Sequence, residues 1–287
     1  MRPTIGVLAP YVGGYYYASV LGGIQRVARD RGARVVAFQT MGLEVTWPGE
    51  PQTNPLGWER IDGWIGINDL CGTAYYERIV AAGKPFVAVS FRLPAPGVCS
   101  VLPDNHGAIT AAVRHLLEHG HRRIGFVGGL NQNDLRERHE GYLAALNEAG
   151  ITVDPALYFS TSSTHEDDGR AVARQLIALG LPCTALVVAT DTNALGVMHE
   201  LQAAGHRVPD DVAIVGFDDI EQAQYASPPL ATMRVPFEVV SARAAEVLLS
   251  RIIDGVRPPE VVRVGATLVT RPSCGCVRAP YRGVSEA

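Results

Sequence analysis

The chain has no apolar stretch long enough to cross a membrane. A spanning helix needs about 20 consecutive apolar residues, and charged residues interrupt every hydrophobic run. It also has no basic excess, because 25 Lys and Arg stand against 29 Asp and Glu and the net charge is −4. Nucleic-acid-binding domains carry a basic face. The composition therefore argues against direct contact with DNA or RNA by this chain.

Cysteines are few and their number is odd. The five thiols are mostly scattered, which fits reduced cysteines of a cytoplasmic protein better than a disulfide framework. The chain enters a strand-like pattern within residues 1–7, and this pattern is unlike a signal peptide. The sequence thus predicts a soluble cytoplasmic protein with no membrane partner.

Common catalytic motifs are also lacking. There is no Gly-x-x-x-x-Gly-Lys-Ser/Thr loop and no Gly-x-Ser-x-Gly elbow, which argues against phosphate-loop and hydrolase chemistry. Val127-Gly128-Gly129 lies at a strand-helix turn, but it lacks the spaced glycines and the downstream acid of a dinucleotide fingerprint. No nucleophile is assembled with a base. We predict that the chain is not an enzyme and uses no cofactor.

The sequence contains two sets of potential metal ligands, and we interpret neither of them as a metal site. Cys274-Gly275-Cys276 has neither a second cysteine pair nor a histidine close to it in the sequence. Of His115, His119 and His121, only the first two follow helical spacing, and the glutamate of a metalloprotease helix is missing. We interpret them as solvated histidines at a helix end. The predicted metal content is none.

Short apolar runs alternate with longer amphipathic stretches. The predicted strands are Ile5–Ala9, Arg34–Phe38, Gly63–Ile67, Phe86–Ser90, Ile124–Val127, Ala185–Ala189 and Ala213–Phe217. The predicted helices are 16–31, 73–82, 106–119, 134–149, 167–179, 192–204 and 237–254. A glycine, which can cap a helix C-terminus, directly follows each of them.

This alternation predicts the fold class. The strand runs are almost continuously apolar, as strands covered on both faces require, and strand-helix alternation indicates a doubly wound parallel sheet. The 287 residues, of which 47% are hydrophobic, suffice for two lobes of roughly 100–150 residues each. We therefore predict an α/β protein with two doubly wound parallel-sheet lobes.

One segment does not follow this rhythm. Residues 41–58 contain three prolines, three glycines and two tryptophans. An irregular surface loop is one interpretation. A cleft flap or a subunit contact is the other, because exposed tryptophans are costly without a partner.

Ligands of parallel sheets bind beyond the carboxyl ends of the strands, so the residues there are the candidates for a site. They include the aromatic run 15–17, Asp69, Arg138, Thr190 and the pair Asp218-Asp219. Aromatic rings can stack on sugar faces, and charged groups can bind pairs of hydroxyls. This mixture predicts a polyhydroxylated ligand.

Several of these polar residues also have structural explanations. Asp219 can cap the following helix with Gln222 in the capping-box position, Asp191 can cap the helix that follows it, and Asp134 begins a similar pattern. Arg138 is either a solvated helix residue or a cleft residue. Because neighbouring residues at a strand end face opposite ways, we predict that Asp218 binds ligand while Asp219 is a cap.

Long segments of the chain resemble the regulators of the lactose/galactose-repressor type. "LPDNHGAITAAVRHLLEHGHRRIGFVGG" (102–129) is similar to the segment that opens the second lobe in that family. "RERHEGYLAALNEAGI" (136–151) resembles the helix that follows it. Residues 189–236, "ATDTNALGVMHELQAAGHRVPDDVAIVGFDDIEQAQYASPPLATMRVP", are similar to its signature, and "LVTRPSC" (268–274) matches its closing strand.

The resemblance implies a periplasmic binding protein-like type I fold with two α/β lobes joined by three crossovers and closing on a small ligand. The implied N-terminal lobe comprises residues 1–102 and 236–264, and the C-terminal lobe comprises 103–235 and 265–276, with 277–287 as a linker or tail. The crossovers near 102–104, 233–236 and 264–267 are the implied hinge.

The resemblance also implies the site residues. Asp218 and Arg138 match the ligand-binding aspartate and arginine of the family, and Thr190 stands where a polar ligand residue occurs. Tyr16 and Tyr17 stand in place of an aromatic pair, although the Asn-Pro that usually precedes it is missing. Asp69 is assigned from its strand-end position alone.

The implied function is that of a sensor domain for a small-molecule effector, a sugar or a nucleoside-like compound, in a transcriptional regulator or signalling protein. The expected assembly is a homodimer. The chain begins at the first core strand, so DNA contact is expected only through an N-terminal helix-turn-helix head outside it. The ending "RPSCGC" resembles sensor domains that precede an output module. An excised sensor domain and a headless repressor core therefore both remain open.

Two other functions are weighed against the sensor. The same fold serves sugar-binding proteins of transporters, against which the lack of a signal peptide argues. A sugar-processing enzyme would need carboxylates about 5–10 Å apart on both sides of a bond. The adjacent Asp218 and Asp219 suit this geometry poorly.

Overall fold

The computed structural model describes residues 2–40, 58–68 and 73–276. They form two compact units, each of which contains segments that are distant in sequence. Unit 1 comprises Met1–Pro103 and Pro236–Val264, and unit 2 comprises Asp104–Val235 and the segment from Gly265 onward. Each unit is described by itself.

Unit 1 contains a six-stranded sheet in the order β11-β5-β4-β3-β1-β2, in which all neighbouring strands are parallel. The strands are β1 (Thr4–Ala9), β2 (Arg34–Gln39), β3 (Gly63–Ile67), β4 (Phe86–Val89), β5 (Cys99–Pro103) and β11 (Val261–Val264). The helices are α1 (Tyr15–Asp30), α2 (Thr73–Ala81) and α8 (Phe237–Asp254).

Helix packing in unit 1 buries the central strands β1, β3, β4 and β5, whereas the edge strand β2 is largely exposed. Helices α1 and α8 pack against each other, and the absence of a side chain at Gly23 allows this approach, because an added Cβ would lie 2.2 Å from Ser241 Oγ. Trp64 and Tyr76 are fully buried in the core cluster that includes Phe86. Strands enclosed in this way read as continuous apolar runs.

Unit 2 contains a second six-stranded sheet in the order β12-β10-β9-β8-β6-β7. The strands are β6 (Ile124–Val127), β7 (Tyr158–Phe159), β8 (Ala185–Val188), β9 (Ala213–Asp218), β10 (Ala231–Arg234) and β12 (Thr267–Val269). Only β12 is antiparallel to its neighbour among these described strands. The helices are α3 (Asn105–Glu118), α4 (Asn133–Glu148), α5 (Glu166–Ala178), α6 (Asp191–Ala203) and α7 (Glu221–Tyr225).

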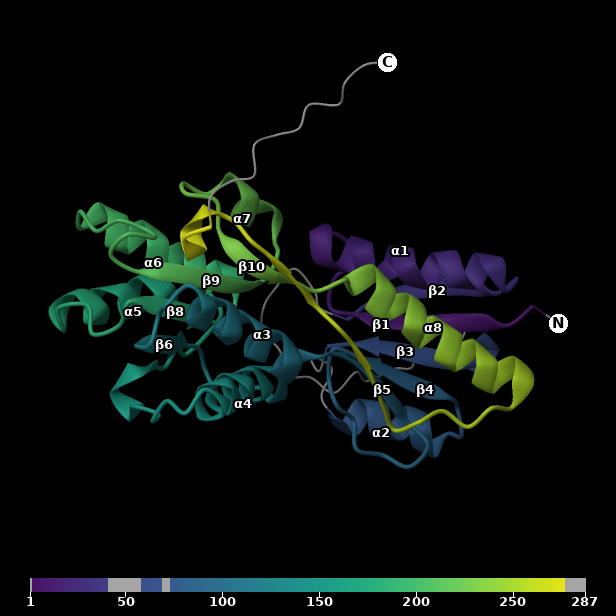
Figure 1. Cartoon of the computed structure of the whole chain (residues 1–287). Coiled ribbons are helices and arrows are strands. Elements are labelled where there is room, and N and C mark those ends of the chain that lie inside the picture. Colours follow the sequence, from purple (N-terminus) through teal and green to yellow (C-terminus); the bar gives the residue numbers. More distant parts are fainter. Residues whose placement is uncertain (1, 41–57, 69–72, 277–287) are drawn as a thin grey trace, which may run out of the picture. The chain divides into compact units, whose positions relative to one another are not determined.

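The helices of unit 2 pack in two pairs, α3 with α4 and α5 with α6 (Figure 1). Both contacts rely on glycine. A Cβ on Gly141 would lie 2.4 Å from the carbonyl oxygen of His106, and a Cβ on Gly196 would lie 2.1 Å from that of Glu166. Because these neighbours are backbone atoms, a larger residue would push the helices apart.

The predicted fold class is confirmed. The seven predicted strands and seven predicted helices all occur, with ends that differ by one residue at most. The seven glycines predicted to stop helices all have positive φ, as at Gly255 with φ 67°. Five strands were not predicted from periodicity, namely β5, β7, β10, β11 and β12.

Some predictions fall outside the described residues, namely those for residues 41–57, for Asp69 and for the tail 277–287. Within the described part of the chain, no helix combines the length and the hydrophobicity that a bilayer crossing requires.

Candidate functional site

The carboxyl ends of the strands carry strained backbone in both units. Five non-glycine residues of the described chain have positive φ, and four of them directly follow or end a strand: Asn68, Ser90, Asp218 and Asp219. Only Leu181 lies elsewhere. Such conformations cost free energy and concentrate at functional sites. The strand-end edges are therefore the places to search for function.

Both sheets share the order 2-1-3-4-5 for their first five strands, counted along the chain within each unit. In this order the crevice for a ligand lies where the direction of winding changes, beyond the carboxyl ends of the first and third strands. In unit 2, Arg138 of α4 and Thr190 after β8 come from this region, and Asp218 ends β9, the strand next to β8.

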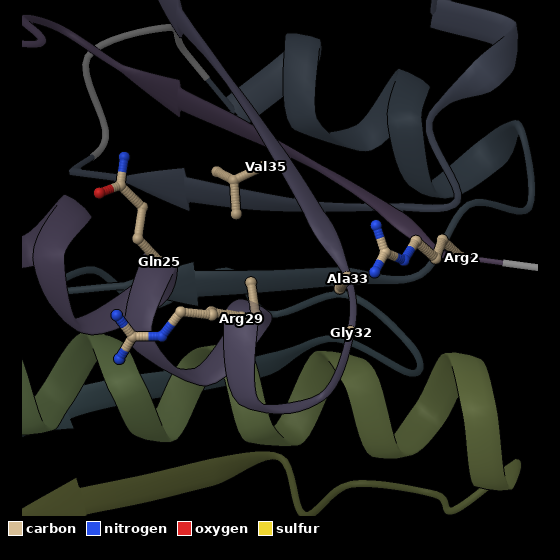
Figure 2. A pocket seen from close by; sticks show the side chains of 7 residues that line it. Arg2, Gln25, Arg29, Gly32, Ala33 and Val35 are labelled. Atoms are coloured by element: carbon tan, nitrogen blue, oxygen red, sulfur yellow. The ribbon is translucent and has the colours of Figure 1, made fainter.

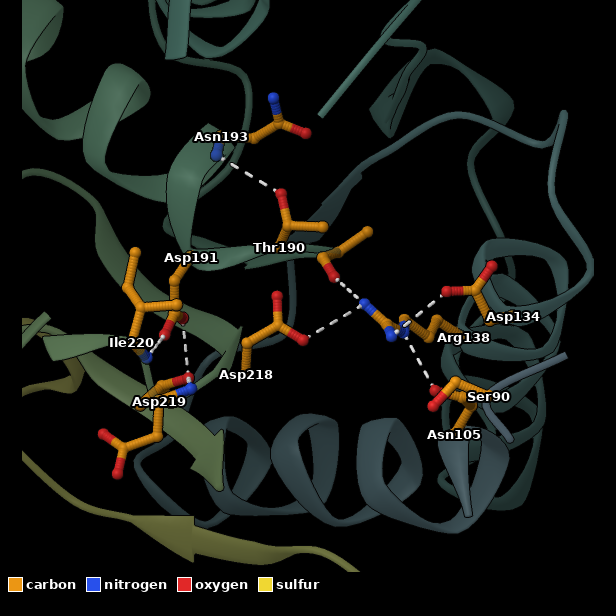
Figure 3. Close-up of polar contacts among 12 residues, drawn as sticks. Ser90, Asn105, Asp134, Arg138, Thr190, Asp191, Asn193, Asp218, Asp219 and Ile220 are labelled. Atoms are coloured by element: carbon orange, nitrogen blue, oxygen red, sulfur yellow. Dashed lines mark hydrogen bonds and ion pairs between the residues drawn. The ribbon is translucent and has the colours of Figure 1, made fainter. Parts of the chain in front are cut away.

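Arg138 is buried and is held by groups from several elements. Its side chain is 7% exposed. Its Nε donates to Asn105 Oδ1 at 3.0 Å, its Nη1 donates to the Ala189 carbonyl at 2.6 Å, and its Nη2 contacts Asp134 Oδ2 at 3.3 Å (Figure 3). The guanidinium carbon lies 3.7 Å from the centre of the Phe217 ring. These contacts fix the plane of the guanidinium.

Asp218 faces this arginine but is incompletely paired. Its Oδ1 lies 3.9 Å from Arg138 Nη1, and its side chain is 24% exposed. Among the described residues, no hydrogen bond to this carboxylate is found, whereas Figure 3 shows it directed toward the guanidinium. The pair therefore offers an acceptor and neighbouring N–H donors to a molecule at the sheet edge.

The environment of Asp218 disfavours its charged form. Burial raises the pKa of Asp218 to about 7, with Arg138 opposing the shift and the charge of Asp134 adding to it. A carboxyl with this pKa changes protonation near neutral pH. Perturbed carboxyls of this kind are common at binding and catalytic sites.

Asp219 does not cap the following helix, contrary to the prediction. Helix α7 begins after Ile220, which provides no side-chain cap. The Asp219 carboxylate instead accepts from Arg234 Nε at 2.5 Å and from Arg271 Nη2 at 2.6 Å. Two arginines satisfy a carboxylate better than a single helix N–H. The two adjacent aspartates do have different partners, so they do not form an acid pair.

The predicted cap at Asp191 is also wrong, because Thr190 takes that place. The Thr190 hydroxyl accepts from the Asn193 N–H at 3.3 Å and caps α6. Asp191 is fully buried, and it accepts from Ile220 N at 3.0 Å and from the Thr232 hydroxyl at 2.6 Å. Burial, together with the nearby Asp218, raises the pKa of Asp191 well above its ordinary value. Asp191 thus ties the loop after β9 to α6.

Asp134 is not a cap either. The residue before α4 is Gln132, which makes no cap hydrogen bond, and Asp134 is the partner of Arg138 one turn away. Asn105 was missed by the sequence reasoning, although it is buried and orients the Arg138 guanidinium. Only its place in the segment that resembles the repressor family pointed to it.

The corresponding edge of unit 1 is aromatic. Tyr16 and Tyr17, from the first turn of α1, are half-buried. The Tyr16 ring packs edge-on against Tyr17 at 4.9 Å and against Phe237 at 4.7 Å, and Tyr11 packs against Tyr17 at 5.7 Å. The aromatic pair predicted from the sequence is therefore part of a larger cluster.

Hydrogen bonds join this cluster to the strained strand ends. The Tyr16 hydroxyl lies 3.2 Å from both Asn68 Oδ1 and Ser90 Oγ. Burial raises the pKa of the Tyr17 phenol, although a hydrogen bond with Asn68 opposes this shift. The Tyr17 phenol is thus neutral near pH 7, and both hydroxyls can act as hydrogen-bonding groups. Within each unit, the predicted residues that the structure describes lie at the same edge.

A surface hollow elsewhere in unit 1 lies at the end of the sheet where an effector is not expected to bind. It has a volume of about 350 Å³ and is lined by residues from the C-terminal half of α1 and the starts of β1 and β2, among them Arg2, Gln25, Arg29 and Val35 (Figure 2). This is the amino end of the sheet, opposite to the edge where α/β proteins bind ligands.

Comparisons with known proteins agree with this geometry. Residues 113–274 match the model of the periplasmic binding protein-like domain family. The ribose operon repressor of Haemophilus influenzae is 30% identical over 275 residues, which cover 94% of this chain and 79% of that protein. The transcriptional repressor PurR of Aliivibrio salmonicida is 29% identical, with 94% and 81% covered.

Solved structures show the same similarity. The structure of a complex of the transcriptional regulator CelR with cellobiose is 27% identical, has a TM-score of 0.77, and is matched over 95% of this chain and 85% of that one. The matches to the repressors extend over both units. The chain therefore belongs to the periplasmic binding protein-like family, as a ligand-binding core of the lactose/galactose-repressor type of transcriptional regulator.

Proposed function

We propose that this chain senses a small polyhydroxylated effector, a free sugar in preference to a nucleoside, at the strand-end edge that carries Arg138 and Asp218. The relatives include a ribose operon repressor and a regulator solved with cellobiose, which supports a sugar. The observation that carries the proposal is the pairing of a buried, fixed guanidinium with a carboxylate that has no closer partner among the described residues.

The chemistry of this pair suits adjacent hydroxyl groups. One hydroxyl can donate to Asp218 while its neighbour accepts from Arg138, and both interactions are charge-assisted. The arginine is already oriented by Asn105, Ala189 and Asp134, so little conformational entropy is lost on binding. Thr190 is proposed as a further polar contact beside its capping role. Phe217 is occupied by the guanidinium and is not proposed to stack on the ligand.

The edge of unit 1 is proposed to contribute to recognition as well. Tyr16 and Tyr17 present half-buried rings and neutral hydroxyls, which suit the apolar faces of a sugar ring. Asp69, which lies outside the described residues, is retained only as a sequence-based proposal.

The regulatory consequences are also proposals. The two units serve as lobes, and the crossovers at 103–104, 235–236 and 264–265 serve as the hinge. A ligand shifts such an equilibrium only by its differential affinity for the two conformations. The protein acts in the cytoplasm as a homodimer, without catalysis, and contacts DNA only through a part outside this chain. Attachment to an output domain remains the alternative.

A calorimetric and thermal-shift titration tests the proposed site. Wild-type protein is titrated with ribose, cellobiose and adenosine, and one of the sugars is expected to raise Tm in a concentration-dependent manner. Asp218→Asn should lower the affinity for that sugar by about 10-fold to 100-fold, since a charge-assisted hydrogen bond contributes about 1.5–3 kcal/mol.

The matched control is Asp167→Asn, which changes an exposed acid of α5 in the same unit and should bind like the wild type. Equal sugar affinity in the Asp218 and Asp167 variants would contradict the proposed site. Binding of adenosine in place of either sugar would change the effector class and leave the site assignment intact.

A further inference from the structure

A cluster of histidines and cysteines lies where α3 meets the segment that follows β12. His115 and His119 are one helical turn apart, and their ring centres are 4.5 Å apart. The Cys276 sulfur lies 3.3 Å from His119 Nε2 and 3.6 Å from His115 Nε2. The Cys274 sulfur lies 3.2 Å from His115 Nε2. The cysteine pair has no histidine close to it in the sequence, but the fold brings His115 and His119 next to it.

Three of the four candidate ligand atoms have the separations of a coordination shell, and the Cys274 sulfur lies close to one of these three, on His115. One ligand atom each from His115, His119 and Cys276 lies within 4.8 Å of the other two. In a tetrahedral site with Zn–S of about 2.3 Å and Zn–N of about 2.0–2.1 Å, nitrogen and sulfur ligands are about 3.5 Å apart. The three nitrogen-sulfur distances, 3.2, 3.3 and 3.6 Å, are close to this value.

We propose that His115, His119, Cys274 and Cys276 form a tetrahedral site for a Zn²⁺-class cation. Two imidazoles and two thiolates are a donor set that selects zinc over magnesium or calcium, which prefer oxygen ligands. A shell closed by four protein ligands is the form that structural zinc sites take.

The surroundings position the cysteines without help from the ion. Ser273, which directly precedes Cys274 in the sequence, is fully buried. Its hydroxyl donates to the Ile214 carbonyl at 2.7 Å and accepts from the Ala231 N–H at 2.7 Å. Cys274 is fully buried, whereas His119 is exposed, so an ion can enter from the His119 side. The segment 271–276 is thus held in a geometry that favours metal binding.

The site is separate from the proposed effector edge. Helix α3 begins at Asn105, which orients Arg138, and His115 lies ten residues further on, about 15 Å along the helix axis. Neither site uses a residue of the other. The expected role of the ion is structural, because it fastens the segment after β12 to the C-terminal end of α3.

Metal binding is tested on reduced, metal-free protein. Co²⁺ is added as a spectroscopic probe, and Zn²⁺ affinity is measured by competition with a chromophoric chelator. One equivalent of Co²⁺ per chain should give the intense visible bands of tetrahedral coordination and a thiolate-to-cobalt charge-transfer band. Zn²⁺ should displace it and, at a hundredfold excess over Kd, raise Tm by roughly 5–10 °C.

Variants connect the signal to the proposed ligands. Cys276→Ser and His119→Ala lie at the accessible side of the cluster and should fold normally, which circular dichroism verifies, while they lower Zn²⁺ affinity by at least about 100-fold. Cys274→Ser should remove about half of the charge-transfer intensity. The matched control is His121→Ala, since His121 contacts Thr184 and should leave the affinity unchanged.

Several results would overturn the proposal. They are the absence of a thiolate-to-cobalt band in the wild type, a Zn²⁺ affinity of Cys276→Ser or His119→Ala equal to that of the wild type, and full charge-transfer intensity in Cys274→Ser. An affinity that falls equally in His121→Ala would also overturn it, because binding would then be to surface histidines in general.

Discussion

The two strand-end edges share a topology and differ in their chemistry. Both follow sheets of the same 2-1-3-4-5 order, and both carry non-glycine residues with positive φ. Unit 2 fills its edge with charged groups, namely Arg138, Asp134 and Asp218. Among the described residues, the edge of unit 1 instead joins neutral groups, the Tyr16 hydroxyl with Asn68 and Ser90.

This difference indicates how each edge maintains its conformation. A buried guanidinium destabilises the folded state unless protein groups form hydrogen bonds with its N–H groups and balance its charge. The edge of unit 2 therefore contains a dense set of partners from α3, α4 and the ends of β8 and β9. A neutral phenol that loses its hydrogen bonds costs much less free energy than a buried charge without partners. The expectation is that unit 2 loses much more stability than unit 1 when one edge residue is removed.

The largest effect is expected for Arg138→Met. Removing the guanidinium leaves Asp134 and Asp218 without their cation, and breaking a buried ion pair costs about 3–5 kcal/mol. Denaturant unfolding should show this loss for the variant. Arg136→Met, which changes an exposed arginine of the same helix, should lie within about 0.5 kcal/mol of the wild type. Equal losses in the two variants would remove the basis for the contrast between the edges.

A smaller effect is expected in the pH dependence of stability. The folded-state pKa of Asp218 is about 7, above the unfolded value of about 3.9. The stability that this group contributes is complete below pH 4 and is lost as the pH rises through 7. Relative to Asp218→Asn, which cannot ionise, the wild type should lose on the order of 2 kcal/mol over this window, a value reduced because the side chain is 24% exposed.

Urea unfolding at several pH values measures this difference between the two proteins. Other titrating groups affect both alike, so the difference isolates position 218. A difference that is constant from pH 4 to 7 would mean that Arg138 holds the carboxylate charged, and the edge of unit 2 would then be a closed ion pair without a free acceptor.

Much of the fold was predictable because it depends on local patterns. Short continuous apolar runs such as Gly63–Ile67 are typical of covered strands, and a glycine after each of the seven predicted helices marks its end. The missed strands had weaker signals. Strand β5 ends on Pro103, and β7 has only two residues, Tyr158 and Phe159. Their pairing is set by neighbours in the sheet and not by their own periodicity.

The location of the candidate site could be proposed from the sequence, whereas the contacts among its residues could not. The strand-end rule placed Arg138 and Asp218 at the same edge, but the roles of the neighbouring acids depend on distant residues. Asp219 accepts a hydrogen bond from Arg271, which is 52 positions away in the sequence. Asp191 accepts one from Thr232, which is 41 positions away. The histidine and cysteine cluster was missed for the same reason. Cys276 meets His119 across 157 residues, and no sequence spacing encodes such a contact.

The smallest effect is expected for Tyr16→Phe, at the neutral edge. The variant keeps the ring contacts with Tyr17 and Phe237 and loses the hydroxyl near Asn68 and Ser90. The contacts are long, at 3.2 Å, and a neutral hydrogen bond contributes about 1 kcal/mol, so the free energy of unfolding should fall by about 0.5–1 kcal/mol. Tyr225→Phe, at a tyrosine that is 75% exposed, provides the control and should show no change. If Tyr16→Phe instead lowers the free energy of unfolding as much as Arg138→Met does, then the phenol stabilises its edge as strongly as the guanidinium stabilises the other. In that case the difference in charge between the two edges does not determine how stable each edge is.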